Sequence, residues 1–171
     1  METWDAIRSR RNVREFSDRV IDSEVLNRIL EAGRLTPSSR NRQPWDFVVV
    51  TEPEQLGHLA GVWKGAWHVA NARAAVAIVG PNLDGERERN TLHFDLGQAV
   101  MSMMLAASDK GVGTGHAYVD DQDLARSILG FPADRHCAHV ISFGYPAERP
   151  LRPRTRADRR PFDEVVHRGN W

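Results

Sequence analysis

The stretch Leu35-Thr-Pro-Ser-Ser-Arg-Asn-Arg-Gln-Pro-Trp45 leads directly into the apolar run Phe47-Val-Val-Val50. The apolar residues at positions 25, 26, 29 and 30 have the spacing of a helix, and the run 47–50 predicts a buried strand. The stretch is therefore a connection from a helix to a strand. Because Pro37 and Pro44 fix φ and restrict the residues before them, we expect this connection to be rigid.

This connection is rich in side chains that both donate and accept hydrogen bonds, namely Ser38, Ser39, Asn41 and Gln43. A rigid loop with such groups suits a heteroaromatic ligand, whose edge alternates between acceptors and N–H groups. The other interpretation is an ordinary surface turn, because Pro, Ser and Asn are also common turn residues. The rest of the chain has to decide between these two interpretations.

The composition limits the classes of protein that are possible. The chain has 171 residues, with 23 basic residues, 23 acidic residues and the single cysteine Cys137. This length predicts one domain over residues 1–171, and the balanced charge gives no global attraction to nucleic acid or to an anionic membrane. One cysteine excludes an internal disulfide, and no stretch resembles a secretory signal or a membrane span. We expect a soluble, cytoplasmic protein.

Hydrophobic periodicity, together with the residues that typically begin and end helices and strands, predicts the other elements. Helices are expected over residues 1–8, 22–33, 54–62, 91–110 and 120–129, and strands over 47–50, 74–79 and 138–143. Asp22 or Ser23, and Asp120 or Asp121, are the candidate helix caps. Residues 82–90 are expected to form a polar loop. The helix 91–110 is apolar on nearly every face, so it belongs in the interior or in a subunit interface.

Two segments suggest contact with a ligand. Four arginines lie within residues 8–14, which is typical either of a solvated basic turn or of a phosphate clamp, because guanidinium groups match phosphate oxygens. The sequence Lys110-Gly-Val-Gly-Thr-Gly-His116 is expected to be a glycine-rich loop. It follows a helix and has the wrong spacing for a dinucleotide fingerprint, but its backbone can approach a flat ligand closely.

Three other features have weaker interpretations. His136 and His139 are expected to point to opposite faces of a strand, so we predict no metal site there. The aromatic group Trp63, Trp67 and His68 is either core packing or a lid over a ligand. Residues 148–171 are rich in Pro and Arg, and their terminal apolar residues favour packing across another surface.

Together these segments resemble the nitroreductase family of flavin enzymes, and the resemblance spans nearly the whole chain. The matching motifs are Arg10-Arg-Asn-Val-Arg14 with Phe16, the intact loop Pro37 to Trp45, Asp95 with Gly97 and Ala99, Gly111-Val-Gly113, and Gly144-Tyr-Pro146. The loop is the most specific of them. The resemblance implies an α+β fold with a central, mostly antiparallel sheet flanked by helices, and a homodimer in which residues 148–171 pack on the partner subunit.

The resemblance also implies FMN as cofactor, NADH or NADPH as electron donor, and a set of cofactor-binding residues. The residues that would hold the phosphate and reach the pyrimidine edge are Arg10, Arg11, Asn12 and Arg14. Those that would approach the same flavin from the partner subunit are Pro37, Ser38, Ser39, Asn41 and Gln43. Those that would lie against the ring are Thr114, Gly115 and His116, and the two arginines that would return to the phosphate are Arg159 and Arg160.

The expected activity is a ping-pong oxidoreductase that passes hydride from NAD(P)H through FMN to a small acceptor such as a nitroaromatic or a quinone. No catalytic side chain is assigned, because the flavin supplies the chemistry. Asn12 stands where the family usually has serine, and Ala157 where a basic residue is common, so Arg156 is a candidate substitute. The alternatives are a deazaflavin enzyme or specialised flavin dehydrogenase of the same fold, and a non-catalytic module that binds a polyanion or nucleic acid.

Overall fold

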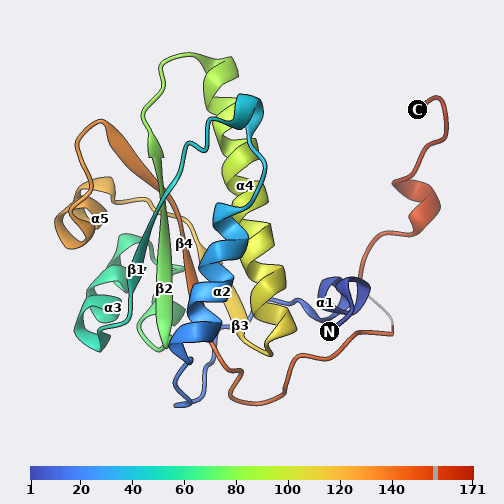
Figure 1. Ribbon diagram of the computed structural model, residues 1–171, viewed down its shortest axis with the longest axis horizontal. Coiled ribbons are helices and arrows are strands. Elements are labelled where there is room, and N and C mark those ends of the chain that lie inside the picture. The colour runs from blue at the N-terminus through green and yellow to red at the C-terminus, as the bar shows by residue number, and fades with distance from the viewer. Residues whose placement is uncertain (156–157) are drawn as a thin grey trace.

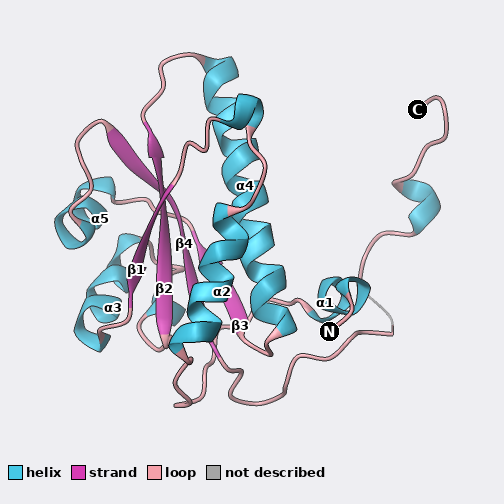
Figure 2. Ribbon diagram, in the orientation of Figure 1, coloured by secondary structure: helices cyan, strands magenta, loops and turns pink. Residues whose placement is uncertain are grey.

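In this computed structural model, which describes residues 1–155 and 158–171, a four-stranded antiparallel sheet forms the centre of the fold (Figure 2). The strands are β1 (Asp46–Val50), β2 (Ala74–Pro81), β3 (Gly113–Ala117) and β4 (Arg135–Gly144), in the order β1-β2-β4-β3. The central strand β2 is buried on both faces along almost its whole length, which explains its uninterrupted apolar run. The predicted α+β class with an antiparallel sheet is confirmed.

Helices cover both faces of the sheet (Figure 1). On one face lie α2 (Ser23–Arg34) and α4 (Glu86–Asp109), which pack against each other and on the apolar side chains of β2 and β4. On the other face lie α3 (Pro53–Leu59), α5 (Gln122–Leu129) and the short turns Ala60–Val62 and Trp67–Val69. The helix α1 (Thr3–Ser9) sits at the C-terminal end of α4, where the N-terminal amine lies 2.6 Å from Asp109 Oδ1.

The helix boundaries follow local chemistry, with one substantial error in the prediction. Asp121 caps α5 by accepting a hydrogen bond from the Leu124 N–H at 2.8 Å, and Gly130 ends this helix with φ of 73°. Asp22 stands at the cap position of α2, but its side chain makes no cap hydrogen bond. The prediction placed the start of α4 at residue 91, whereas the helix begins at Glu86, because the charged residues 86–90 form its first solvated turns.

The sheet corrects three other predictions. Residues 113–117 are the edge strand β3, not a glycine-rich loop, because they pair with β4 in register Gly113 with Gly144 through Ala117 with Val140. The strand β2 continues through Pro81, which is paired with Arg135. A bulge between Ile78 and Val79 puts His139 opposite Ile78 and His136 opposite Gly80, so the two histidines share a face, contrary to the prediction.

The C-terminal segment leaves the body of the molecule. Leu151 is buried with Val13, Phe16 and Ala72, and beyond it the chain runs outward to the short turn Phe162–Glu164 and the terminus, away from the sheet (Figure 1). All described residues after Leu151 are exposed. None of the described helices combines the length and the hydropathy that crossing a membrane requires. The placement of residues 148–171 on a partner subunit remains a prediction.

Candidate functional site

The loop of residues 36–45 has a defined structure that is held by one buried carboxylate. Asp95 on α4 is 3% exposed and accepts the Ser39 N–H with both oxygens, at 3.0 and 3.2 Å. Inside the loop, Ser38 Oγ accepts the Gln43 N–H at 2.8 Å, and the Asn41 N–H donates to the Ser38 carbonyl at 2.9 Å. The sequence therefore uses its serines to close the loop and Asp95 to attach it to α4.

The backbone of this loop is strained. Arg40, Asn41 and Gln43 have φ of 54°, 54° and 49°, a region that residues other than glycine rarely adopt. Such strain persists only where the surrounding contacts determine the conformation, and it clusters at functional sites. The side chains of Arg40, Asn41 and Gln43 are exposed rather than packed. These features favour a loop preformed for a ligand over an ordinary surface turn.

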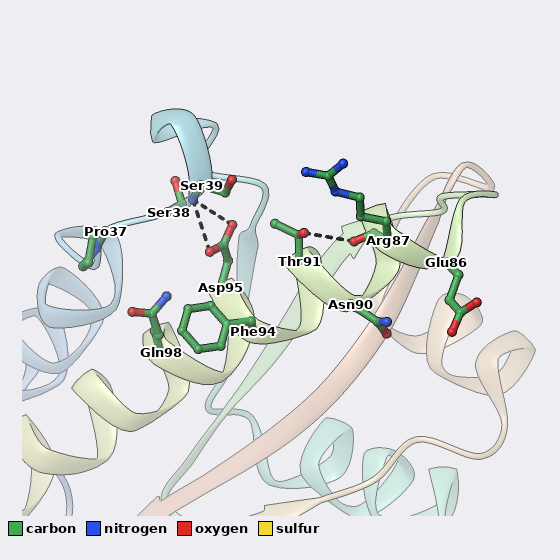
Figure 3. A pocket seen from close by; sticks show the side chains of 10 residues that line it. All are labelled: Pro37, Ser38, Ser39, Glu86, Arg87, Asn90, Thr91, Phe94, Asp95 and Gln98. Atoms are coloured by element: carbon green, nitrogen blue, oxygen red, sulfur yellow. Dashed lines mark hydrogen bonds between the residues drawn. The ribbon is translucent and has the colours of Figure 1, made fainter. Parts of the chain in front are cut away.

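A hollow of about 860 Å³ opens beside this loop, along the N-terminal half of α4 (Figure 3). Its loop side is formed by Pro37, Ser38 and Ser39, and its helix side includes Phe94 and Gln98. The ring of Phe94 is 69% exposed, which is unusual for an aromatic side chain on a central helix. Polar loop atoms and an exposed ring therefore face the same space.

The arginine-rich segment lies elsewhere, alongside the edge strand β3. The Val13 N–H donates to the Thr114 carbonyl at 2.8 Å, and Asn12 forms an isolated parallel bridge with Thr114. Arg10 Nη1 donates to Asn12 Oδ1 at 3.4 Å. The predicted residues Arg10, Asn12 and Thr114 are thus brought together, and residues 12–13 extend the sheet beyond β3.

This corner of the protein, the arginine corner, is formed by Arg10, Arg11, Arg14 and Arg159 and is positively charged. Burial lowers the pKa of Arg10, and repulsion from Arg159 and then Arg154 lowers it further. In the described residues, no carboxylate forms an ion pair with Arg10, Arg14 or Arg159. A cluster of guanidinium groups that are not paired with a carboxylate suits a phosphate, which would neutralise their charge.

The strand β3 shows why glycine is needed next to these arginines. A Cβ atom on Gly115 would lie 2.6 Å from the Val13 carbonyl oxygen and 3.0 Å from Ser142 Oγ, so no side chain fits there. The neighbouring residues Thr114 and His116 have different surroundings. Thr114 is buried, and its Oγ1 has no hydrogen-bond partner among the described residues, whereas His116 is exposed.

Two of the predicted arginines make other contacts. Arg11 Nη2 donates to the Arg149 carbonyl at 2.8 Å, which ties the start of the chain to the C-terminal segment. Arg160 pairs with Glu164 at 3.3 Å, and among the described residues it forms no hydrogen bond with Arg10, Arg14 or Arg159. The candidate substitute Arg156 and the departure at Ala157 lie outside the described residues.

His68, whose role the sequence left open, lies behind the candidate site. Its side chain is fully buried, its Nδ1 lies 2.8 Å from Ser142 Oγ, and that hydroxyl donates to the Gly115 carbonyl at 3.1 Å. Burial lowers the pKa of His68, and Arg14 lowers it further. His68 therefore supports β3 from behind as a neutral ring, while the neighbouring Trp67 is 49% exposed. The expected aromatic group is split between core and surface.

One chain does not bring the two predicted halves of the site together. The loop is attached to α4 at Asp95, whereas the arginine corner lies at the C-terminal end of α4, near Asp109. The helix rises about 21 Å between these two residues, at about 1.5 Å per residue. The loop and the arginine corner therefore lie toward opposite ends of α4 (Figure 1).

Comparison with known proteins gives a consistent result. The model of the nitroreductase family matches residues 7–83. A protein of Archaeoglobus fulgidus, named as a candidate NADH dehydrogenase/NAD(P)H nitroreductase, is 30% identical over 174 residues that cover 99% of both chains.

Solved structures agree. A candidate NADH dehydrogenase/NAD(P)H nitroreductase of Parabacteroides distasonis superposes with a TM-score of 0.84 at 27% identity, over 100% of this chain and 99% of that one. A protein of Clostridium difficile R20291, described as an FMN-dependent nitroreductase, has the same fold, with a TM-score of 0.84 at 24% identity over 97% and 98% of the two chains.

Proposed function

The chain belongs to the nitroreductase family of oxidoreductases, and on that premise we propose that it is an FMN-dependent enzyme that oxidises NADH or NADPH and acts as a homodimer. The single observation that supports this most directly is the arginine corner beside β3. It offers several guanidinium groups, a strand edge and a position where only glycine fits, and within the described residues no carboxylate forms an ion pair with its arginines.

In this proposal, each side chain of the arginine corner has a defined task. Arg10, Arg11, Arg14 and Arg159 bind the FMN phosphate, and Asn12 presents its amide beside them. The backbone of Thr114 and Gly115 lies against the ring, and His116 stands at its edge. Arg160 is retained as a weaker candidate, because its observed partner is Glu164.

The second half of the site would come from the other subunit. The loop residues Pro37, Ser38, Ser39, Asn41 and Gln43 present hydroxyl and amide groups from a strained, preformed backbone. Since they lie at the far end of α4 from the arginine corner, a second copy is needed to place both halves on one ligand. The exposed Phe94 and Met101 on α4 fit such an interface, and residues 148–171 would pack on the partner.

The chemistry that FMN supplies when bound is two-electron transfer, in ping-pong order, from NAD(P)H to an oxidised acceptor such as a nitroaromatic or a quinone. The protein binds and orients the ring and keeps positive charge near it. Arg10 and Asn12 would stabilise negative charge that develops at the pyrimidine edge. We assign no side chain as an obligatory proton donor, because solvent has access to the exposed His116 edge.

Substitution Arg10→Ala tests the proposal. The purified wild-type protein is expected to be yellow, with the two-band absorption of FMN, and to keep its flavin on gel filtration. Arg10→Ala is expected to lose most of the bound flavin, whereas Arg28→Ala, which removes an exposed arginine of α2, is expected to keep it. Full retention of FMN by Arg10→Ala would contradict the proposal, and a spectrum without the two flavin bands would favour a deazaflavin.

A further inference from the structure

A second group of arginines lines a groove in the C-terminal segment, next to the arginine corner. The groove has a volume of about 700 Å³ and is lined by Arg11, Arg149, Arg152 and Arg154 together with two prolines. Burial lowers the pKa of Arg11, and repulsion from Arg149 and Arg154 adds to this effect, while the nearby carboxylate of Glu148 opposes it. Within residues 1–155 and 158–171, none of these four arginines forms an ion pair.

The groove is fixed to the body of the protein. Leu151 is buried in the small core formed with Val13 and Phe16, and this packing fixes the position of the backbone on either side of it. Arg8 Nε donates to the Arg154 carbonyl at 3.0 Å, and the Arg154 N–H donates back to the Arg8 carbonyl at 3.3 Å. These anchors fix the backbone that carries Arg152 and Arg154, so both side chains line one groove although their charges repel.

The positive charge here exceeds what one flavin phosphate can neutralise. A phosphate monoester carries a charge of about −1.5 to −2 at neutral pH, which two guanidinium groups balance. Arg154 lies close enough to Arg10 to lower the pKa of Arg10, so the groove is continuous with the proposed flavin-phosphate site. With Arg10, Arg11, Arg14 and Arg159 assigned to the flavin phosphate, the outer arginines Arg149 and Arg152 remain, and in the described residues neither forms an ion pair.

We propose that this groove binds the 2′-phosphate of NADPH, so that the protein prefers NADPH to NADH. This inference rests on the proposed function and deepens it by choosing between the two electron donors. The two dinucleotides differ only in that phosphate. The groove shares Arg11 with the proposed flavin-phosphate site, but its other arginines lie beyond that site and are available to the second phosphate. A planar guanidinium also binds a phosphate with two parallel hydrogen bonds, which gives geometric selectivity as well as attraction.

The test uses the flavin-loaded protein and two small probes. Adenosine 2′,5′-bisphosphate and adenosine 5′-monophosphate differ by the 2′-phosphate, and calorimetry in a phosphate-free buffer measures the affinity of each. The bisphosphate is expected to bind at least tenfold more tightly. Arg152→Ala is expected to reduce this preference roughly tenfold, the size of one hydrogen bond between charged groups, and Arg152→Lys to restore part of it. Arg168→Ala, which removes an exposed arginine of the same segment outside the groove, serves as the control.

A kinetic measurement completes the test. The ratio of kcat/KM for NADPH to that for NADH is expected to fall in Arg152→Ala by the same factor as the probe preference. Equal binding of the two probes, an unchanged ratio in Arg152→Ala, or release of FMN by the bisphosphate would each overturn the inference. A protein that binds no flavin would overturn the proposed function itself, whereas a flavin-loaded protein without the probe preference would overturn only the inference.

Discussion

Removing the carboxylate of Asp95 is expected to damage flavin binding more than it damages stability. Asp95 accepts the Ser39 N–H at 3.0 and 3.2 Å from a nearly fully buried position, and it is the attachment of the loop to α4. In Asp95→Ala that N–H loses its charged acceptor. The loop is then free to relax from the conformation in which it presents Ser38, Asn41 and Gln43.

The two effects have different magnitudes. A hydrogen bond to a charged group contributes about 1.5–3 kcal/mol, and the three residues with positive φ store about 1–2 kcal/mol each. Relaxation of the loop returns part of that strain, so the net loss of unfolding free energy is about 1–2 kcal/mol, or roughly 3–6 °C in melting temperature. Flavin binding then has to restore the strained loop, which costs about 3 kcal/mol and weakens binding about a hundredfold.

Two measurements check this prediction. Circular dichroism gives the melting temperature of the protein without flavin, and flavin fluorescence gives its dissociation constant for FMN. Asp95→Asn keeps the shape and one oxygen and is expected to fall between the wild type and Asp95→Ala, whereas the exposed surface variant Asp134→Asn is expected to change neither value. A loss of stability without a larger loss of flavin affinity would refute the argument, because the loop would then need no anchor to hold its binding conformation.

Three further predictions concern Gly115, the cap of α5 and the titration of four histidines. Gly115→Ala forces a Cβ to 2.6 Å from the Val13 carbonyl oxygen and is expected to cost about 1–3 kcal/mol in urea unfolding; an unchanged midpoint would show that β3 can shift freely. Asp121→Ala removes the cap of α5 and is expected to cost about 1 kcal/mol, measured as a lower melting temperature, whereas the exposed neighbour Asp120→Ala is the control. Desolvation of the ring lowers the pKa of four histidines, so the unfolded chain binds more protons than the folded protein as the pH falls through about 6.5, and stability is expected to fall as the pH drops from 7 to 5. These histidines are His68, His116, His136 and His139. Urea titrations at pH 7 and pH 5 measure the loss of stability, and His68→Gln is expected to reduce that loss.

The elements with a strong local signal were predictable from the sequence. The helix α2, the strand β1 and the end of α5 at Gly130 follow from periodicity and from a glycine with positive φ, and they lie close to where the pattern put them. The strand β3 was missed because Gly113 and Gly115 have low strand propensity. They are strand residues only because β4 pairs with one side of them and residues 12–13 lie close on the other.

The candidate site was also predictable only where local sequence patterns mark it. Residue types at fixed spacing identified the loop and the arginine segment, and the resemblance to a family connected them. The bond from Ser39 to Asp95 joins positions 56 residues apart, and the His68–Ser142–Gly115 chain joins three separate elements. No local pattern encodes such contacts, because they depend on how the elements pack. Similarly, the bulge that puts His136 and His139 on one face of β4 is visible only in the strand register.

The position of α4 explains why the proposed site needs two chains. Its first half anchors the loop through Asp95, and its last turn, at Asp109, lies against α1, next to the arginine segment. A rigid helix about 21 Å long between these points keeps the two halves of one chain from closing on a single ring. If each ligand is shared by two copies, then binding of FMN and association of subunits are linked, and whatever strengthens one strengthens the other by the same free energy. The strained loop fits this arrangement, because a conformation fixed in advance by Asp95 reduces the ordering cost of forming an interface and a binding site together.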